Sequence, residues 1–230
     1  MTEYMSMTSL KEDLNHVAGQ NFEQKANRKV SKTKTHILNG ELAILARKKH
    51  LKQALKCFKH AEAKGMILDA HSYTNILNGY VRCGDMSGAL EWFKGMVDSS
   101  VQPNIVTLTT LLKGFCEAGQ LKEASDIFFH YILGINPTDY AITPSNTVNS
   151  QTLLNKTLEI KRNDVEMNVR SVNTFLRGCA RVGAILAAMN AYSVTHLLDA
   201  TSYELLIGLL CRSGRLIVAY SLLASYTAEM

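Results

Sequence analysis

The sequence predicts an all-α protein, an α-solenoid of antiparallel helix pairs stacked in repeats of 35 residues. The first observation that predicts it is the period, because apolar residues and glycines recur at a spacing of 35: Leu77 returns as Leu112 and Phe93 as Phe128. The second is the pattern inside the unit 70–104, where two runs of apolar residues at helical spacing flank a glycine. A fixed period of this length is typical of stacked repeats, which bury a core between neighbours.

The unit 70–104 contains every element that such a repeat needs. Gly84 suits the left-handed residue that ends the first helix, and Pro103 suits the stop before the next unit. Ala89 is expected where the two helices approach each other most closely. A larger residue at that position should cost roughly 1–3 kcal/mol of stability.

The chain divides into four parts. Residues 1–34 are polar and mixed in charge, and we expect a flexible leader. Residues 35–138 hold three repeats, of which the first has Lys49 where the turn glycine belongs. The period fails in 139–168, which we interpret as either an insertion or a decayed repeat. It returns in 169–230 at a step of 31 as two shortened repeats, and we expect the second helix to supply the shortening.

Composition and motifs exclude several functional classes. Hydrophobic residues make up 47% of the chain, which excludes general disorder, and no apolar run approaches the roughly 18 residues of a membrane helix. We expect no enzymatic activity and no cofactor, because the chain has no Gly-rich phosphate loop, no GxSxG and no HExxH. The net charge of +5 is compatible with a polyanionic partner but does not require one.

The five cysteines predict neither a disulfide framework nor a metal site. Their number is odd, no CxxC pair occurs and the histidines are scattered. Small buried thiols are the expected state. Four of them fall near the end of a first helix, at positions that we expect to be packed: Cys83, Cys116, Cys179 and Cys211.

One unit carries enough signature residues to resemble the pentatricopeptide repeat family. The tetratricopeptide repeat is the competitor, but its Trp-Leu-Gly-Tyr signature is absent, and the VQPN ending over a period of 35 favours the pentatricopeptide form. The resemblance implies a right-handed superhelix that binds single-stranded RNA, one base per repeat, mostly in mitochondria and plastids. The residues that carry it are Tyr73, Gly79, Gly84, Ala89, Phe93, Met96 and Pro103.

The resemblance also implies which side chains read the bases, because in this family the fifth and last residues of a unit do so. Short polar side chains at these positions can reach the Watson–Crick edge of a splayed base. By family analogy the first and fourth units would prefer uracil and the second adenine, whereas Glu204 departs from the pattern in the last unit. The implied pairs are Asn39 with Asp69, Thr74 with Asn104, Thr109 with Thr138 or Asp139, and Asn173 with Asp199.

Two further sets of residues are candidates for contact with RNA. His36, His71 and Val106 are second residues of units, which in the family stack on bases, although a histidine at an exposed helix start is also an ordinary surface residue. An arginine recurs near the end of the first helix in four units, and such a stripe would follow a phosphate backbone. The helix dipole alone also favours arginine there, so both interpretations stand. These arginines are Arg47, Arg82, Arg181 and Arg212.

The sequence thus predicts an adaptor that binds single-stranded RNA selectively in organellar RNA processing, editing, stabilisation or translation. RNA-processing or ribosomal proteins are expected as further partners, and a membrane is not. The alternative is a helical-repeat protein–protein scaffold, for example a subunit of an organellar ribosome or RNA-processing complex. Family analogy predicts a mitochondrion or plastid, although residues 1–17 contain acidic side chains and do not form a clear transit peptide.

Overall fold

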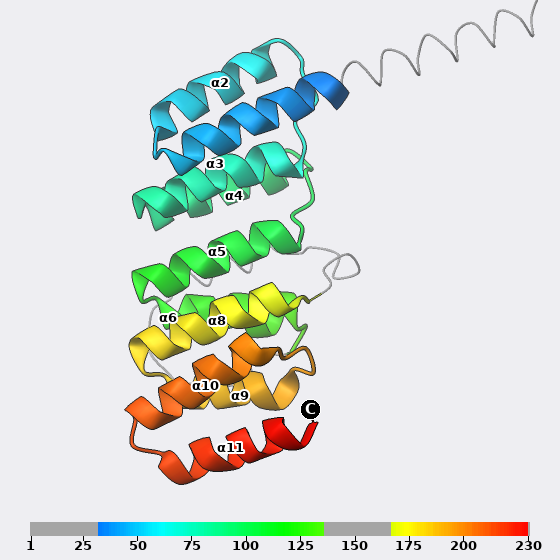
Figure 1. The fold of residues 1–230 in the computed structure, drawn as a ribbon. Coiled ribbons are helices and arrows are strands. Elements are labelled where there is room, and N and C mark those ends of the chain that lie inside the picture. The colour runs from blue at the N-terminus through cyan, green and yellow to red at the C-terminus, as the bar shows by residue number, and fades with distance from the viewer. Residues whose placement is uncertain (1–31, 136–166, 230) are drawn as a thin grey trace, which may run out of the picture.

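The chain folds into a stack of helix pairs, as the period predicts (Figure 1). The computed structural model describes residues 32–135 and 167–229, and these contain helices and no strand. First helices of the pairs are the helix 32–47, α3 (Ala70–Cys83), α5 (Ile105–Ala118), α8 (Val169–Val182) and α10 (Ala200–Arg212). Second helices are α2 (Leu51–Ala63), α4 (Met86–Asp98), α6 (Leu121–Ser125) with η1 (Asp126–Ile132), α9 (Ile185–Val194) and α11 (Leu216–Glu229).

First helices of successive units lie side by side, so that α3, α5, α8 and α10 form one continuous layer (Figure 1). This layer presents the same helix positions at regular intervals along the stack. The fold is therefore an α-solenoid, in which each unit buries its apolar face against its neighbours. Within the described ranges, no helix is both long and apolar enough to cross a membrane.

Most of the first helices begin with the same polar motif. Asp69, Asn104 and Asp199 each occupy the position before the helix, and each side chain accepts a hydrogen bond from the backbone N–H three residues later. The hydroxyl of that third residue in turn accepts a hydrogen bond from the backbone N–H of the cap residue, and the two bonds together form a capping box. The predicted last residues of the units therefore have a structural role as helix caps.

Glycines in the left-handed conformation end α3, α5 and α8. Gly84 has φ of 78° and its N–H bonds the carbonyls of Tyr80 and Val81. Lys49 takes the same conformation in the first unit, with φ of 60°. The departure from glycine noted in the sequence therefore preserves the turn, although a residue with a Cβ is less favoured there.

A second glycine position sets the distance between successive units. Gly79, Gly114 and Gly178 each face the preceding helix pair. A Cβ added at Gly114 would lie 2.6 Å from Sδ of Met86, and one added at Gly178 would lie 2.7 Å from Cβ of Cys116. The recurrence of glycine along the sequence thus reflects close packing of helices rather than a turn.

The core between the third and fourth units is aromatic. Phe128 stacks on Phe175 with ring centroids 4.4 Å apart, and Phe129 meets the same ring edge to face at 5.5 Å. Both phenylalanines of η1 are fully buried, although they are adjacent in the sequence. The wider π-helical turn places them together on the inner side, a feature that the period did not predict.

The fourth unit differs from the unit 70–104 in the length of its second helix. α9 has 10 residues, whereas α4 has 13. α11 has 14, so the step of 31 residues arises in α9.

The segment predicted to be an insertion or a decayed repeat, 139–168, lies outside the described residues except at its end. α5 nevertheless packs directly on α8, so the third and fourth units are neighbours in the stack.

The cysteines differ in exposure, and Cys57 is half-buried. Cys116 and Cys179 are buried, and burial raises the pKa of the Cys116 thiol to about 12 and also raises that of Cys179. The expectation of packing is wrong for Cys83 and Cys211, which are exposed. Cys83 is the last residue of α3, and Cys211 is the last residue but one of α10.

Candidate functional site

A hollow of about 810 Å³ opens between the helix 32–47 and α3. It brings together Asn39 and Asp69, which the sequence predicts to read a base, with His36 and His71, which it predicts to stack. Both histidines are exposed, and Asn39 and Asp69 are half-buried. The residues that line it are Lys32, Thr35, His36, Asn39, Gly40, Ile67, Asp69, His71 and Asn75.

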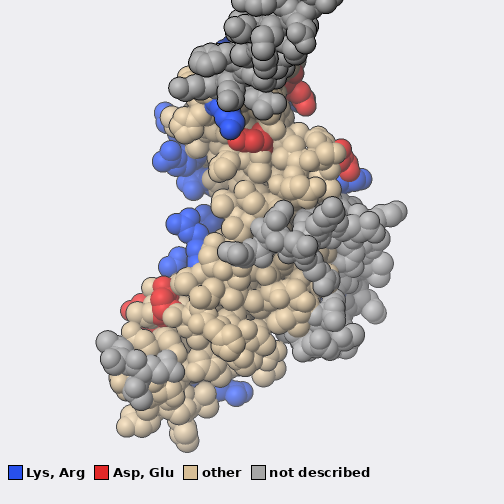
Figure 2. Space-filling view, turned by 90° about the vertical axis from the view of Figure 1, so that its right-hand side faces the viewer, with Lys and Arg blue, Asp and Glu red and all other residues tan. Residues whose placement is uncertain are grey.

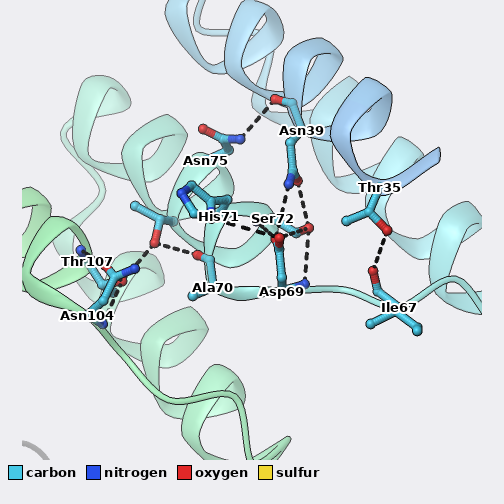
Figure 3. A network of polar contacts seen from close by, with 11 residues as sticks. Thr35, Asn39, Ile67, Asp69, Ala70, His71, Ser72, Asn75, Asn104 and Thr107 are labelled. Carbon is cyan, nitrogen blue, oxygen red and sulfur yellow. Dashed lines mark hydrogen bonds and ion pairs between the residues drawn. The ribbon is translucent and has the colours of Figure 1, made fainter. Parts of the chain in front are cut away.

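A hydrogen-bond network joins Asn39 and Asp69 at the floor of this hollow (Figure 3). Nδ2 of Asn39 donates to Oδ1 of Asp69 at 3.1 Å, and Oγ of Ser72 donates to Oδ1 of Asn39 at 2.7 Å. Asp69 also accepts from the backbone N–H of Ser72 at 3.0 Å. Because an ionised carboxylate only accepts, the amide nitrogen must face Asp69, and the amide oxygen then faces Ser72.

Asn75 and His71 complete this group. Nδ2 of Asn75 donates to the backbone carbonyl of Asn39 at 2.9 Å. Nδ1 of His71 lies 3.8 Å from Oδ2 of Asp69. Burial opposes ionisation of Asp69, but hydrogen bonds from Ser72 and Asn39, with the charge of His71, bring its pKa below the ordinary value. The carboxylate is therefore ionised at neutral pH and able to hold the amide.

The fourth unit repeats the arrangement. Nδ2 of Asn173 donates to Oδ1 of Asp199 at 3.0 Å, and Oγ of Ser202 donates to Oδ1 of Asn173 at 2.7 Å. Hydrogen bonds from Asn173 and from the backbone of Ser202 lower the pKa of Asp199. Two units 134 residues apart in the sequence thus build one geometry from the same three residue types.

The second unit uses its predicted pair differently. Oγ1 of Thr74 donates to the carbonyl of Ala70 at 2.6 Å, and Oγ1 of Thr107 lies 2.8 Å away. Either hydroxyl can donate to the other, because Thr74 also reaches the carbonyl of Ala70 and Thr107 also reaches Oδ1 of Asn104 at 3.1 Å. Asn104 accepts from the N–H of Thr107 at 3.0 Å, so Thr74 and Asn104 are linked through Thr107. Thr74 is only 8% exposed.

The candidate residues of the third unit are only partly described. Thr109 is buried, and its hydroxyl donates to the carbonyl of Ile105 at 2.7 Å. Its predicted partners, Thr138 and Asp139, lie outside the described residues. Val106, predicted to stack on a base, is 53% exposed.

The four predicted phosphate-binding arginines lie on the first helices, and they differ in exposure. Arg47, Arg181 and Arg212 are exposed. Arg82 is half-buried, and among the described residues its Nε has no hydrogen-bond partner. Figure 2 shows lysine and arginine side chains gathered along the edge of the stack that faces the viewer in Figure 1, where the first helices lie.

Two further cationic residues lie beside Arg181. Lys113 of α5 and Arg177 of α8 line a hollow of about 260 Å³ together with Arg181 and Thr174. Lys113 also lies 3.8 Å from Glu117. Arg177 stands one helical turn before Arg181 on the same face of α8, and this spacing of four residues is visible in the sequence.

The residues that sequence reasoning missed are chiefly hydroxyls. Ser72 and Ser202 bond the predicted base-reading asparagines, and Thr107 bonds Thr74. The family rule pairs the fifth and last residues of the same unit. It therefore overlooks these hydroxyls, because they belong to the next unit. Each follows a cap residue by three positions, which is the signature of a capping box.

Within the described residues, no cluster of three or more His, Cys, Asp or Glu side chains could hold a metal ion.

Sequence comparison finds similarity to one repeat family. The pattern described as "PPR repeat family" matches residues 68–117, and that described as "PPR repeat" matches 106–130. A pentatricopeptide repeat-containing protein of Arabidopsis thaliana is 28% identical over 166 residues, 69% of this chain and 16% of the relative. A chloroplastic one from the same plant is 36% identical over 67 residues, 29% of this chain and 9% of the relative. The chain thus spans less than a fifth of the length of these relatives.

Solved structures with a similar fold contain the same kind of repeat. The pentatricopeptide domain of Arabidopsis thaliana protein-only RNase P 1, in complex with tRNA, superposes with a TM-score of 0.57 at 15% identity, over 83% of this chain and 88% of that one. The maize protein PPR10, in complex with an 18-nt psaJ RNA element, gives 0.51 at 18% identity, over 84% of this chain and 25% of that one. At these identities the likeness shows the fold alone.

Proposed function

The chain belongs to the pentatricopeptide repeat family, and from this premise we propose that it binds single-stranded RNA sequence-selectively along the layer of its first helices. The observation that carries the proposal is the hydrogen-bonded pair Asn39–Asp69, which lies in one hollow with His36 and His71. The same pair recurs as Asn173–Asp199.

Each asparagine presents a defined hydrogen-bonding edge to a base. After its bonds to Asp69 and Ser72, the amide of Asn39 keeps one N–H and one oxygen lone pair. These groups pair with the carbonyl and N–H of a uracil edge, which a single strand exposes when its base is splayed out. His36 and His71 then stack on the faces of neighbouring bases. The first and fourth units accordingly select uracil.

The arginines supply the contribution that does not depend on sequence. Arg47, Arg82, Arg181 and Arg212 lie on four of the five first helices, and α5 has Glu117 at the equivalent place. Lys113 of α5 and Arg177 of α8 add cations between the third and fourth units. Each cation that neutralises a phosphate contributes about one unit to the dependence of affinity on salt concentration. Affinity therefore falls as salt rises, while the preference for particular bases stays.

The biological setting of the proposal follows the relatives. The two structural neighbours are named as complexes with tRNA and with an 18-nt RNA element, and curated relatives are named as mitochondrial or chloroplastic proteins. We propose a non-catalytic adaptor for organellar RNA processing, editing, stabilisation or translation. One neighbour is a domain of an RNase, but no catalytic motif stands out in this sequence.

RNA binding across a salt series tests the proposal. The full chain is mixed with a single-stranded RNA carrying uracils for the first and fourth units, and a scrambled RNA of equal composition is the control. Affinity should fall with salt for both RNAs, and the matched RNA should bind more tightly at each concentration. Equal affinity for the two RNAs, or no response to salt, would refute selective binding.

The second unit offers a test of base reading. Replacing Thr74 by Asn and Asn104 by Asp reproduces the pair of the first unit, and Thr107 already carries the hydroxyl at the position of Ser72. The preference at the second base should move from adenine to uracil, while the preferences at the other bases remain. An unchanged second preference in a folded double variant would mean that these two side chains do not face the RNA.

A further inference from the structure

A hydroxyl from the next unit contacts each base-reading asparagine. Ser72 is the third residue of the second unit, yet its hydroxyl bonds Asn39 of the first unit at 2.7 Å (Figure 3). Ser202 is the third residue of the fifth unit, and it bonds Asn173 of the fourth at 2.7 Å. In each case the bond is shorter than the one from the amide to the aspartate.

The contact matters because an asparagine amide has little orientational preference of its own. Rotation about the last side-chain torsion of Asn is broad, so hydrogen bonds decide which way the oxygen and nitrogen point. Asp69 holds only the nitrogen of Asn39. Without the hydroxyl of Ser72, the amide oxygen loses its bond and the plane of the amide is free to tilt toward or away from the base.

We propose that Ser72 and Ser202 are positioning residues for base recognition, each fixing the amide of the preceding unit so that its remaining N–H faces a uracil carbonyl. The inference rests on the proposed function, since a positioned amide matters only if it reads RNA. It adds a third residue to each reading pair and makes the preference of one unit depend on its successor.

The other junctions fit this assignment. Thr107 is the third residue of the third unit, and its hydroxyl bonds the fifth residue of the unit before it, Thr74. Ser171 holds the same position in the fourth unit but donates to the carbonyl of Asn168 at 2.7 Å. Ser171 therefore has the capping role alone and provides a matched control.

Selection from a pool of short random single-stranded RNAs tests the proposal, using the full chain and the variants Ser72→Ala, Ser202→Ala, Ser72→Thr and Ser171→Ala. In Ser72→Ala the preference for uracil at the base read by the first unit should drop about 3–10-fold, the range expected for one lost neutral hydrogen bond. Preferences at the other bases should stay. Ser202→Ala should do the same at the fourth unit alone. Ser72→Thr should restore selectivity, since it keeps the hydroxyl.

Three results would overturn the inference in distinguishable ways. If the wild-type chain enriches no sequence, the proposed function fails and the inference falls with it. If the wild type selects uracil and both alanine variants keep that selectivity, only the positioning role is refuted. If Ser72→Ala weakens all bases equally, as lost capping in Ser171→Ala would, the serine is merely structural. Circular dichroism of each variant checks folding, and the two alanine sites give independent readings should one variant unfold.

Discussion

Replacing Gly178 by Ala tests how tightly the third and fourth units pack. The added Cβ would lie 2.7 Å from Cβ of Cys116 and 3.5 Å from its Cα. These atoms are fixed to the backbone of α5, so no side-chain rotation relieves the clash and the two helices must separate. Overpacking of this kind costs about 1–3 kcal/mol. Alanine regains about 1 kcal/mol of helix propensity, so we expect a net loss of about 0–2 kcal/mol.

Urea unfolding followed by circular dichroism measures this loss, and Gly208→Ala is the matched control. Gly208 also lies inside a first helix, but the nearest atom to its added Cβ is Nη1 of Arg212 at 3.6 Å, an ordinary contact. Gly208→Ala should therefore keep only the gain in propensity and stabilise the chain by up to about 1 kcal/mol. If Gly178→Ala proves as stable as Gly208→Ala, the helix contact is not as close as described and the reasoning is wrong.

Three further predictions concern reactivity, pH and the core. In the folded chain at neutral pH, iodoacetamide should label the exposed thiol of Cys83 but not that of Cys116, which is buried and has a pKa raised to about 12. Equal labelling of the two thiols would contradict this prediction. The pKa of Asp199 lies below its ordinary 3.8, so the ionised carboxylate stabilises the fold above that pH, and this stabilisation is lost as the pH falls through the pKa of the folded chain. Acid should therefore lower the unfolding midpoint more in the wild type than in Asp199→Asn, whose amide still caps the helix. Thermal unfolding should show that Phe128→Ala lowers the free energy of unfolding by about 3–5 kcal/mol. Ile217 is 88% exposed, so Ile217→Ala should lower it by less than about 0.5 kcal/mol, and similar losses in the two variants would refute the stacked core.

The period predicted the helix pairs because burying an apolar face against a neighbour requires the same residue at the same place in each unit. Gly84 ends α3 as expected, and Lys49 shows that the turn persists where the signature residue is lost. The π-helical turn that buries both Phe128 and Phe129 could not be predicted in this way. It depends on the fit to Phe175, which is far along the chain and whose equivalents in other units, such as Ile76 and Leu111, are aliphatic.

The candidate site was predicted in part. Family resemblance pairs Asn39 with Asp69, and the two side chains are hydrogen-bonded. The same rule pairs Thr74 with Asn104, which are joined only through Thr107. The rule considers one unit at a time, whereas the hydrogen bonds cross the junction between units. The capping-box spacing marks the third residue of the following unit, but its bond to the fifth residue of the unit before could not be found without the geometry.

The contact between α5 and α8 also bears on the RNA sequence that the proposed function would select. Cys116 packs beside Gly178, and Phe128 stacks on Phe175, so no further helix pair lies between the third and fourth first helices. A decayed repeat within the stack would leave one unread base between the two. Under the proposed function, neighbouring units would instead hold Thr109 and Asn173 opposite consecutive bases, so the selected RNA should hold the uracils of the first and fourth units with two bases between them.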